Sequence, residues 1–435
     1  METLRILRNK DLTLLLIGKL TSMLGSNVQQ FALSLYVYAL TGSATLFASM
    51  LAISILPRLL FSPFAGVFGD WFDRKKMIVS LDIFNGVMLL GFSYLLMVRG
   101  DFNLLSVYIL VVMLEITEIF YESSSSGIVP SIVKQEKMVE ARSLMSLSMS
   151  IARLASPMIG AALFGFAGLL VVLVFNAVSF LLSAAMELFI HVPPMHKRPE
   201  KLNVKSFFTD LKEGLKVVKD NKFIATIISL GTIVNFVIGP LFAVGYLVII
   251  VDVLGGSEVE YGLYQTIMAI SMVGAPILVA GYIKKFDIPK VTVISFMVVG
   301  VLVVSIAVVP FMAGFRMFDN SILPFALLMV ISFFIGLSIS VVNITIETLF
   351  AQIVPVHMMG RTSTVLNLLV TIMIPIGQMS FGFLFDTINP LYVILIAGGL
   401  LLVSIMVFRK RLLMASTIIE KPEQKSEKEG VAHAV

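Results

Sequence analysis

Long apolar runs alternate with short polar segments along the whole chain. An α-helix rises 1.5 Å per residue, so a helix needs about 20 apolar residues to cross the hydrocarbon core of a bilayer. The pattern predicts an all-α integral membrane protein with twelve transmembrane helices. The predicted spans lie at approximately 12–39, 44–69, 77–98, 104–126, 141–166, 168–190, 223–252, 259–283, 290–313, 320–349, 361–385 and 389–409.

Two of these boundaries need a further argument. The apolar run from 141 to 190 is nearly continuous, and we divide it at Ala167–Gly168 because it is too long for one crossing. The first run follows a charged stretch, but no small-residue cleavage site comes after it. We therefore interpret it as a retained helix and not as a signal peptide.

The positions of Lys and Arg predict the orientation. If the N-terminus is cytoplasmic, 27 of the 32 basic residues fall in cytoplasmic segments and two, Arg99 and Arg316, fall in outer loops. Cytoplasmic loops of membrane proteins carry such an excess. The bias predicts a multi-pass protein of the cell inner (plasma) membrane with both termini in the cytoplasm.

The predicted spans form two sets of six. Segment 191–222 between them carries eight Lys or Arg residues, and its apolar residues recur at helical spacing from Val204 to Val218. This pattern indicates an amphipathic helix at the headgroup surface, and a solvated linker is the alternative. The predicted organisation is an N-terminal six-helix bundle at 1–190, this linker, a C-terminal bundle at 223–409 and a disordered cytoplasmic tail at 410–435.

Two short segments repeat in corresponding spans. The residues Glu, Ile, Val and Pro keep the same spacing in 122–130, at the end of span four, and in 347–355, at the end of span ten. Pro157 and Gly160 in span five have a counterpart in the Pro-Ile-Gly run 375–377 of span eleven. The repeats predict two pseudo-symmetric halves, an arrangement in which transporters bind substrate between the halves at the membrane midplane.

Composition excludes several functional classes. The chain is 58% hydrophobic and 14% charged, against about 25% charged residues in soluble domains. It has no Cys, which excludes thiol catalysis and thiolate metal sites. The four His lack metal-ligand spacing, and no phosphate-binding glycine loop or catalytic triad is present. We expect a monomer that is not an enzyme, with no cofactor, no metal and no nucleic-acid partner.

The segment between spans two and three carries the most specific motif. It reads Gly66-Val-Phe-Gly-Asp70-Trp-Phe-Asp73-Arg74-Lys75-Lys76 and resembles the loop 2–3 signature of the major facilitator superfamily. The resemblance implies the major facilitator fold, transport by alternating access, and a gating role for Gly66, Asp70, Asp73, Arg74 and Lys75. The basic cluster also suits the anionic inner leaflet.

Further segments resemble one branch of that superfamily. Asp at position 73, the run 36–44 that closes span one and the stretch 213–222 are similar to macrolide-efflux proteins and enterobactin exporters among the drug:proton antiporters. Span five keeps Pro157 and small neighbours but lacks most glycines of the antiporter motif. The branch commonly has an acidic residue near Ser26–Asn27, where this chain has none, so no coupling role is assigned to that position.

Ionisable residues inside the predicted spans are candidates for function, because charge is costly in hydrocarbon. At 1.5 Å per residue, Arg58 and Arg153 lie about 18 Å from the inner end of their spans, and Glu115 and Glu118 about 12–17 Å. Lys19 and Asp82 lie about 8–11 Å deep. All of these residues are in the first six spans, so we expect the coupling machinery there.

Span four contains Glu115, Glu118 and Glu122 at positions i, i+3 and i+7, which places them on one helical face. Three carboxylates on one face in a low-dielectric site cannot all stay ionised cheaply, so at least one should bind a proton near neutral pH. Our hypothesis is that Glu115 or Glu118 carries the coupling proton with Arg58 or Arg153 as counter-charge, and that Asp82 takes part. Static ion pairs that hold helices together are the alternative.

The repeat also suggests a gate. Glu122 and Glu347 occupy equivalent positions near the inner ends of spans four and ten. We expect them to meet Arg142 and Arg361 at the start of the next spans. Ordinary solvation of helix ends is the alternative.

Polar residues at midspan are the candidates for substrate binding: Asn27, Gln30, Tyr36, Asn235, Asn343 and Gln378. With 33 Phe and 25 Met, a broad apolar cavity is expected, and such surfaces repack around varied ligands. We therefore expect export of hydrophobic compounds, such as macrolides and other drugs, in exchange for protons. The alternative is export of a siderophore or flipping of a lysophospholipid.

Overall fold

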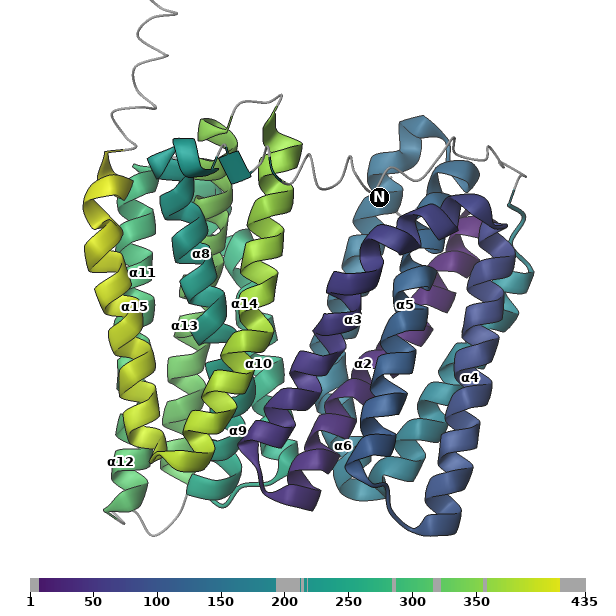
Figure 1. The fold of residues 1–435 in the computed structure, drawn as a ribbon, viewed down its shortest axis with the longest axis horizontal. Coiled ribbons are helices and arrows are strands. Elements are labelled where there is room, and N and C mark those ends of the chain that lie inside the picture. Colours follow the sequence, from purple (N-terminus) through teal and green to yellow (C-terminus); the bar gives the residue numbers. More distant parts are fainter. Residues whose placement is uncertain are drawn as a thin grey trace, which may run out of the picture. The chain divides into compact units, whose positions relative to one another are not determined.

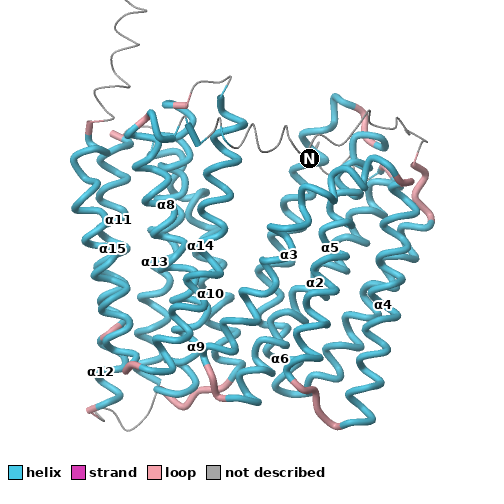
Figure 2. The backbone as a smooth tube through the Cα atoms, in the orientation of Figure 1, coloured by secondary structure: helices cyan, strands magenta, loops and turns pink. Residues whose placement is uncertain are grey.

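The computed structural model describes residues 8–192, 212, 215–216, 218–283, 287–315, 322–354 and 358–414, and omits the side chains of 59, 62–71, 276–283 and 361. All regular secondary structure in these described ranges is helical (Figure 2). Most of the predicted amphipathic linker helix, and the predicted tail beyond residue 414, lie outside them.

The first half of the chain forms long helices joined by short turns (Figure 1). They are α2 (Lys10–Thr41), α3 (Ala44–Trp71), α4 (Arg74–Arg99), α5 (Leu104–Ile132), the 3-10 turn η2 (Gln135–Lys137) and α6 (Met138–Leu188). Side chains cap the N-termini of three of these helices: Asn9 caps α2, Asp73 caps α4 and Asn103 caps α5. Each accepts a hydrogen bond from a backbone N–H that has no partner within its helix.

Helix α6 is interrupted at Gly168. The backbone there has φ 74° and ψ 175°, a conformation essentially reserved for glycine, and helix continues on either side. The predicted division of the run 141–190 at Ala167–Gly168 is therefore confirmed, and α6 comprises two helical segments.

The second half begins with a continuous helical run, α8 (Lys222–Pro240), η3 (Leu241–Gly245), α9 (Tyr246–Val248) and η4 (Ile249–Val253). The two η segments are π-helical turns, and they follow Pro240, which has no backbone N–H to donate. The remaining helices are α10 (Glu258–Ile283), α11 (Ile288–Ile306), α12 (Val308–Gly314), α13 (Ile322–Ile353), α14 (Met359–Thr387) and α15 (Pro390–Leu413).

The helices agree with the predicted spans to within a few residues at most ends. In the described residues, eight helices are long and apolar enough to cross a membrane, and one of these eight contains both segments of α6. Large apolar side chains are exposed along them, for example Tyr94 at 64% and Met97 at 65%, which suits a surface that faces lipid. The all-α membrane fold is confirmed, while the count of twelve crossings stays a prediction.

The chain divides into two compact units. One contains residues 1–203 and 257–266, and the other contains 204–256 and 267–435. The first unit, which holds α2 to α6, is the one that carries most of the predicted intramembrane charges.

Helix α2 packs closely against α6 through small residues. A Cβ added to Gly160 would lie 2.9 Å from the carbonyl oxygen of Val28, which leaves no room for a side chain. On the other segment of α6, Ser179 and Asn176 occupy the space that a side chain at Gly25 would need. Small residues of this kind let membrane helices approach each other. The close approach fixes the side of α2 that faces the cavity described below.

Candidate functional site

A cavity of about 270 Å³ lies within the first unit, between α2, α3, α5 and α6. Seven of the predicted site residues line it: Asn27, Gln30, Arg58, Glu115, Glu118, Glu122 and Arg153. The other lining residues are Lys19, Met23, Ser26, Gln29, Leu33, Val111, Leu114, Met149 and Phe180. The fold therefore brings together both the acidic face of α5 and the amides of α2.

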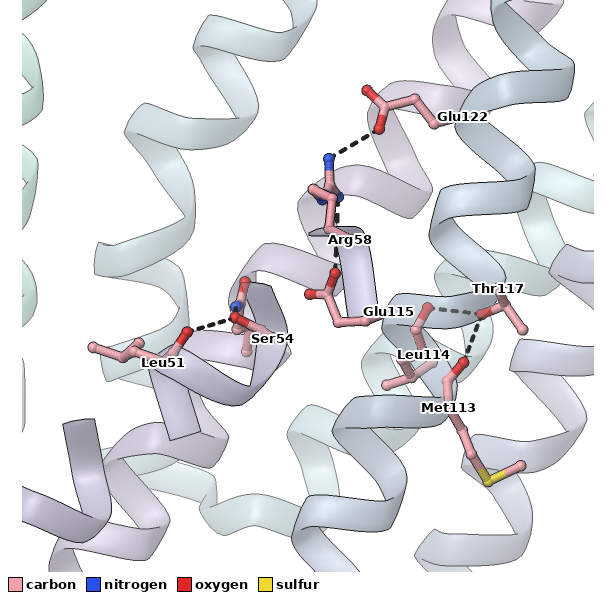
Figure 3. A network of polar contacts seen from close by, with 9 residues as sticks. Leu51, Ser54, Arg58, Met113, Leu114, Glu115, Thr117 and Glu122 are labelled. Carbon is pink, nitrogen blue, oxygen red and sulfur yellow. Dashed lines mark hydrogen bonds and ion pairs between the residues drawn. The ribbon is translucent and has the colours of Figure 1, made fainter. Parts of the chain in front are cut away.

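Arg58 joins α3 to the acidic face of α5 (Figure 3). Its Nη1 donates to Oε2 of Glu122 at 3.0 Å, and its Nη2 lies 3.8 Å from Oε2 of Glu115. The side chains of Arg58 and Glu122 are each 45% exposed, whereas that of Glu115 is 18% exposed. One guanidinium thus spans two carboxylates that lie two helical turns apart, because the i and i+7 positions share a face.

Glu118 lies between these two carboxylates on α5. In the described residues it makes no ion pair within 4.0 Å, and the cations that attract it are the Lys19 ammonium on α2 and Arg58. That ammonium donates to the hydroxyl of Ser125 at 3.2 Å. Glu118 is therefore a cavity carboxylate that no guanidinium holds directly.

The charges of the cavity balance when every group is ionised. Lys19, Arg58 and Arg153 face Glu115, Glu118 and Glu122 across the same space. Binding one proton at a carboxylate gives the cavity a net positive charge, and releasing it restores neutrality. Protonation of one carboxylate therefore changes the net charge that the cavity presents to a ligand.

The amides of α2 line the same cavity. The Nε2 of Gln30 donates to Ser54 Oγ at 2.9 Å, and Ser54 donates to the carbonyl of Leu51 at 2.8 Å. The buried Nδ2 of Asn27 has no hydrogen-bond partner in the described part of the chain. A buried donor of this kind is costly unless a ligand or water accepts from it, so Asn27 is a candidate ligand contact.

Two predicted residues of the first unit lie elsewhere. The hydroxyl of Tyr36 accepts from the N–H of Phe102 at 2.9 Å and lies 3.4 Å from its carbonyl, so it ties α2 to the turn before α5. Asp82 is 1% exposed on α4 and is not a lining residue of the cavity. Tyr36 instead lines a separate cavity with Phe164 and Leu170, and its role in substrate binding stays a prediction.

The remaining substrate candidates belong to the second unit. Asn235 donates to the carbonyl of Gly231 in its own helix at 3.0 Å, and Asn343 is exposed. Gln378 is 7% exposed, and its Oε1 has no hydrogen-bond partner in the described residues. Gln378 is thus the best candidate for a polar ligand contact on this unit.

The basic residues of the loop 2–3 motif hold the first unit together. Arg74 Nη1 donates to the carbonyl of Gly127 on α5 at 2.8 Å, and Lys75 Nζ donates to the carbonyl of Leu188 at the end of α6 at 2.8 Å. Asp73 caps α4 by accepting from the N–H of Lys76 at 3.1 Å. Gly66 lies within α3, and the side chain of Asp70 lies outside the described residues.

Of the two predicted gate pairs, the one between Glu122 and Arg142 is not formed, and the one between Glu347 and Arg361 is not described. Glu122 pairs with Arg58 instead of Arg142, which is exposed at the start of α6. Glu347 is exposed near the end of α13, and the side chain of its expected partner, Arg361, lies outside the described residues. Of the two pairs, the one at Glu122 therefore differs from the sequence-based expectation.

Sequence reasoning missed several polar residues of the first unit. Gln29 accepts from Nδ2 of Asn176 at 2.5 Å, which links α2 to α6. Glu187 is fully buried and accepts from the hydroxyl of Tyr121 at 2.7 Å. Its place near the end of a predicted span makes it resemble a solvated helix terminus, so periodicity alone gives no signal for its burial.

A model of the Major Facilitator Superfamily matches residues 15–378. The chain belongs to this superfamily. Macrolide efflux protein A of Streptococcus pyogenes is 22% identical over 394 residues, which cover 88% of this chain and 92% of that protein. The protein of the same name from Enterococcus faecalis is 23% identical and covers 76% of this chain and 98% of that one. The superfamily and these relatives agree with a transporter of small molecules.

Solved structures of other superfamily members share the fold. A bacterial homologue of the iron transporter ferroportin in an inward-facing state has a TM-score of 0.68 at 19% identity, covering 93% of this chain and 99% of that one. The nucleoside transporter NupG has a TM-score of 0.71 at 13% identity, covering 91% and 98%. At such identities the likeness shows the fold and carries no substrate information.

Proposed function

We propose that this superfamily member exports hydrophobic compounds by alternating access, in exchange for protons. The names of the relatives point to efflux of a macrolide, a bulky lipophilic molecule. The observation that carries the proton coupling is the cavity, which three carboxylates of α5 line and where Arg58 pairs with two of them, Glu115 and Glu122.

Glu118 is the proposed proton carrier. Arg58 pairs with Glu115 and Glu122, whereas Glu118 faces the cavity without an ion pair in the described residues. Protonation of Glu118 removes one negative charge beside Arg58 and Lys19. A cationic group of the cargo in the same cavity favours release of that proton. Proton and cargo then compete for the same space, which is the basis of exchange.

The lining of the cavity supports a lipophilic cargo. Met23, Met149 and Phe180 contribute deformable apolar surface, and Asn27 offers an unused amide donor. Apolar side chains beside charged and amide groups suit a lipophilic ligand that also carries a cationic or polar group.

We also propose the cellular setting. The bias of Lys and Arg supports the inner (plasma) membrane with both termini in the cytoplasm. The working unit is a monomer surrounded by lipid, with protons and one small molecule as its partners.

The test uses the purified full chain in liposomes with an imposed pH gradient. A fluorescent lipophilic cation and a macrolide should each move against the proton gradient, and unrelated lipophiles should compete with both. If neither compound moves under any gradient, that result contradicts drug export. Transport of only one ligand, with no competition by other lipophiles, would instead favour a dedicated siderophore or lysophospholipid transporter.

A further inference from the structure

A second group of ionisable side chains lies enclosed between α4, α5 and α6, away from the lining of the cavity. Asp82 on α4 is 1% exposed, Tyr121 on α5 is 2% exposed and Glu187 on α6 is fully buried. The two carboxyl groups are close enough to repel each other when both are ionised. The group therefore brings two acids into the interior of the first unit.

The hydrogen bonds of the group are unequal. The Tyr121 hydroxyl donates to Oε1 of Glu187 at 2.7 Å, so this carboxyl acts as an acceptor. Neither Oε2 of Glu187 nor Oδ2 of Asp82 has a hydrogen-bond partner in the described residues, although both atoms are buried. Each of these two unpartnered carboxyl oxygens could therefore bind a proton.

The surrounding positive charge does not match two carboxylates. The Lys19 ammonium of α2 attracts Glu187, but it also attracts Glu118 on α5. Two basic residues at the start of α4 donate elsewhere: Arg74 to the carbonyl of Gly127 and Lys75 to the carbonyl of Leu188. One shared cation does not compensate Glu118, Glu187 and Asp82 together. An unpaired buried carboxylate is costly, and protonation removes that cost.

We propose that Asp82 and Glu187 form a second, enclosed proton-binding site, in which Asp82 holds the proton and Glu187 stays ionised. Tyr121 and Lys19 both stabilise the charge of Glu187, whereas the polar neighbour of Asp82 is the neutral hydroxyl of Ser183. Lys19 also lines the cavity and interacts with Glu118, so it connects the two carboxylate groups. The role of this site in transport rests on the proposed function, but the binding of the proton does not.

Infrared spectroscopy of the purified full chain at neutral pH tests the site directly, because a protonated carboxyl has a C=O band that shifts in D₂O. We expect Asp82→Asn to remove one protonated carboxyl and Glu187→Gln to retain it, because the burial of Asp82 still opposes its ionisation when the repulsion by Glu187 is gone. Glu136→Gln, which neutralises an exposed acid, is the control and should change nothing in this band.

The opposite results would overturn the assignment. An Asp82→Asn spectrum that matches the wild type contradicts a proton on Asp82. Loss of the band when sodium replaces potassium at fixed pH would identify a sodium site instead.

If Asp82→Asn fails to fold, wild-type protein with ¹³C-labelled Asp carboxyls answers the same question: the band must shift with Asp labelling and not with Glu labelling. None of these measurements needs a cargo, so they can succeed even if drug export is wrong.

Discussion

At the scale of single residues, Arg58 distinguishes the carboxylates of the cavity, because it pairs with Glu115 and Glu122 and leaves Glu118 without an ion pair in the described residues. The i, i+3, i+7 pattern of Glu115, Glu118 and Glu122 indicates one helical face, and all three line one cavity. The partner of Glu122 could not be derived in this way, because Arg58 reaches it from α3 and the relative rotation of two helices is a tertiary property. The partner of Tyr36 could not be derived from spacing either, because its hydroxyl is hydrogen-bonded to Phe102 in the turn before α5.

Gly127 provides a residue-scale prediction about the loop 2–3 motif. A Cβ at this position would lie 2.5 Å from Cζ of Arg74, within the space that the guanidinium occupies. Gly127→Ala should displace Arg74 from the Gly127 carbonyl and destabilise the protein by about 1–3 kcal/mol, as overpacking typically does. Thermal unfolding of the purified variant measures this effect.

The control for this prediction is the same substitution in an Arg74→Ala background. There the added methyl group has room, so Gly127→Ala should cost clearly less than in the wild type. An equal loss of stability in both backgrounds would mean that Arg74 is not the group that restricts this position.

At the scale of helices, the sequence predicts most of the structure. The apolar runs locate the helices and even the interruption at Gly168, because bilayer thickness limits the length of one crossing. The π-helical turns η3 and η4 were not predicted, since Pro240 indicates a disturbed helix but not the form that the helix takes after it. The burial of Glu187 depends on which face of α6 packs inward, which the weak periodicity of an apolar helix does not reveal.

The break at Gly168 gives the element-scale prediction. No atom lies within 4 Å of a Cβ added there, so Gly168→Ala should act through backbone strain alone and destabilise by about 1–3 kcal/mol. The matched control is Gly91→Ala inside α4, where a Cβ also meets nothing within 4 Å. Because Gly91 is helical, that variant should be neutral or gain up to about 1 kcal/mol. Equal thermal stability of the two variants would show that the chain does not need a glycine at the break.

At the scale of the whole molecule, the orientation in the membrane is open to a direct test. The chain has no Cys, so single cysteines can be introduced without a prior substitution. The exposed residues Asp101, between α4 and α5, and Glu136, between α5 and α6, lie at opposite ends of α5. In intact cells, a membrane-impermeant maleimide should label Asp101→Cys and not Glu136→Cys. The reverse pattern would invert the orientation that the basic residues predict.

The central claim is that a carboxylate of the first-unit cavity carries the proton that is exchanged for cargo. Its most direct test follows proton movement inside liposomes with a pH-sensitive dye when a gradient of the lipophilic cation is imposed without a pH gradient. The wild type and the exposed-acid control Glu136→Gln should move protons against the cation, and Glu118→Gln should not, although all three remain folded. Undiminished cation-driven proton movement in Glu118→Gln would contradict the account.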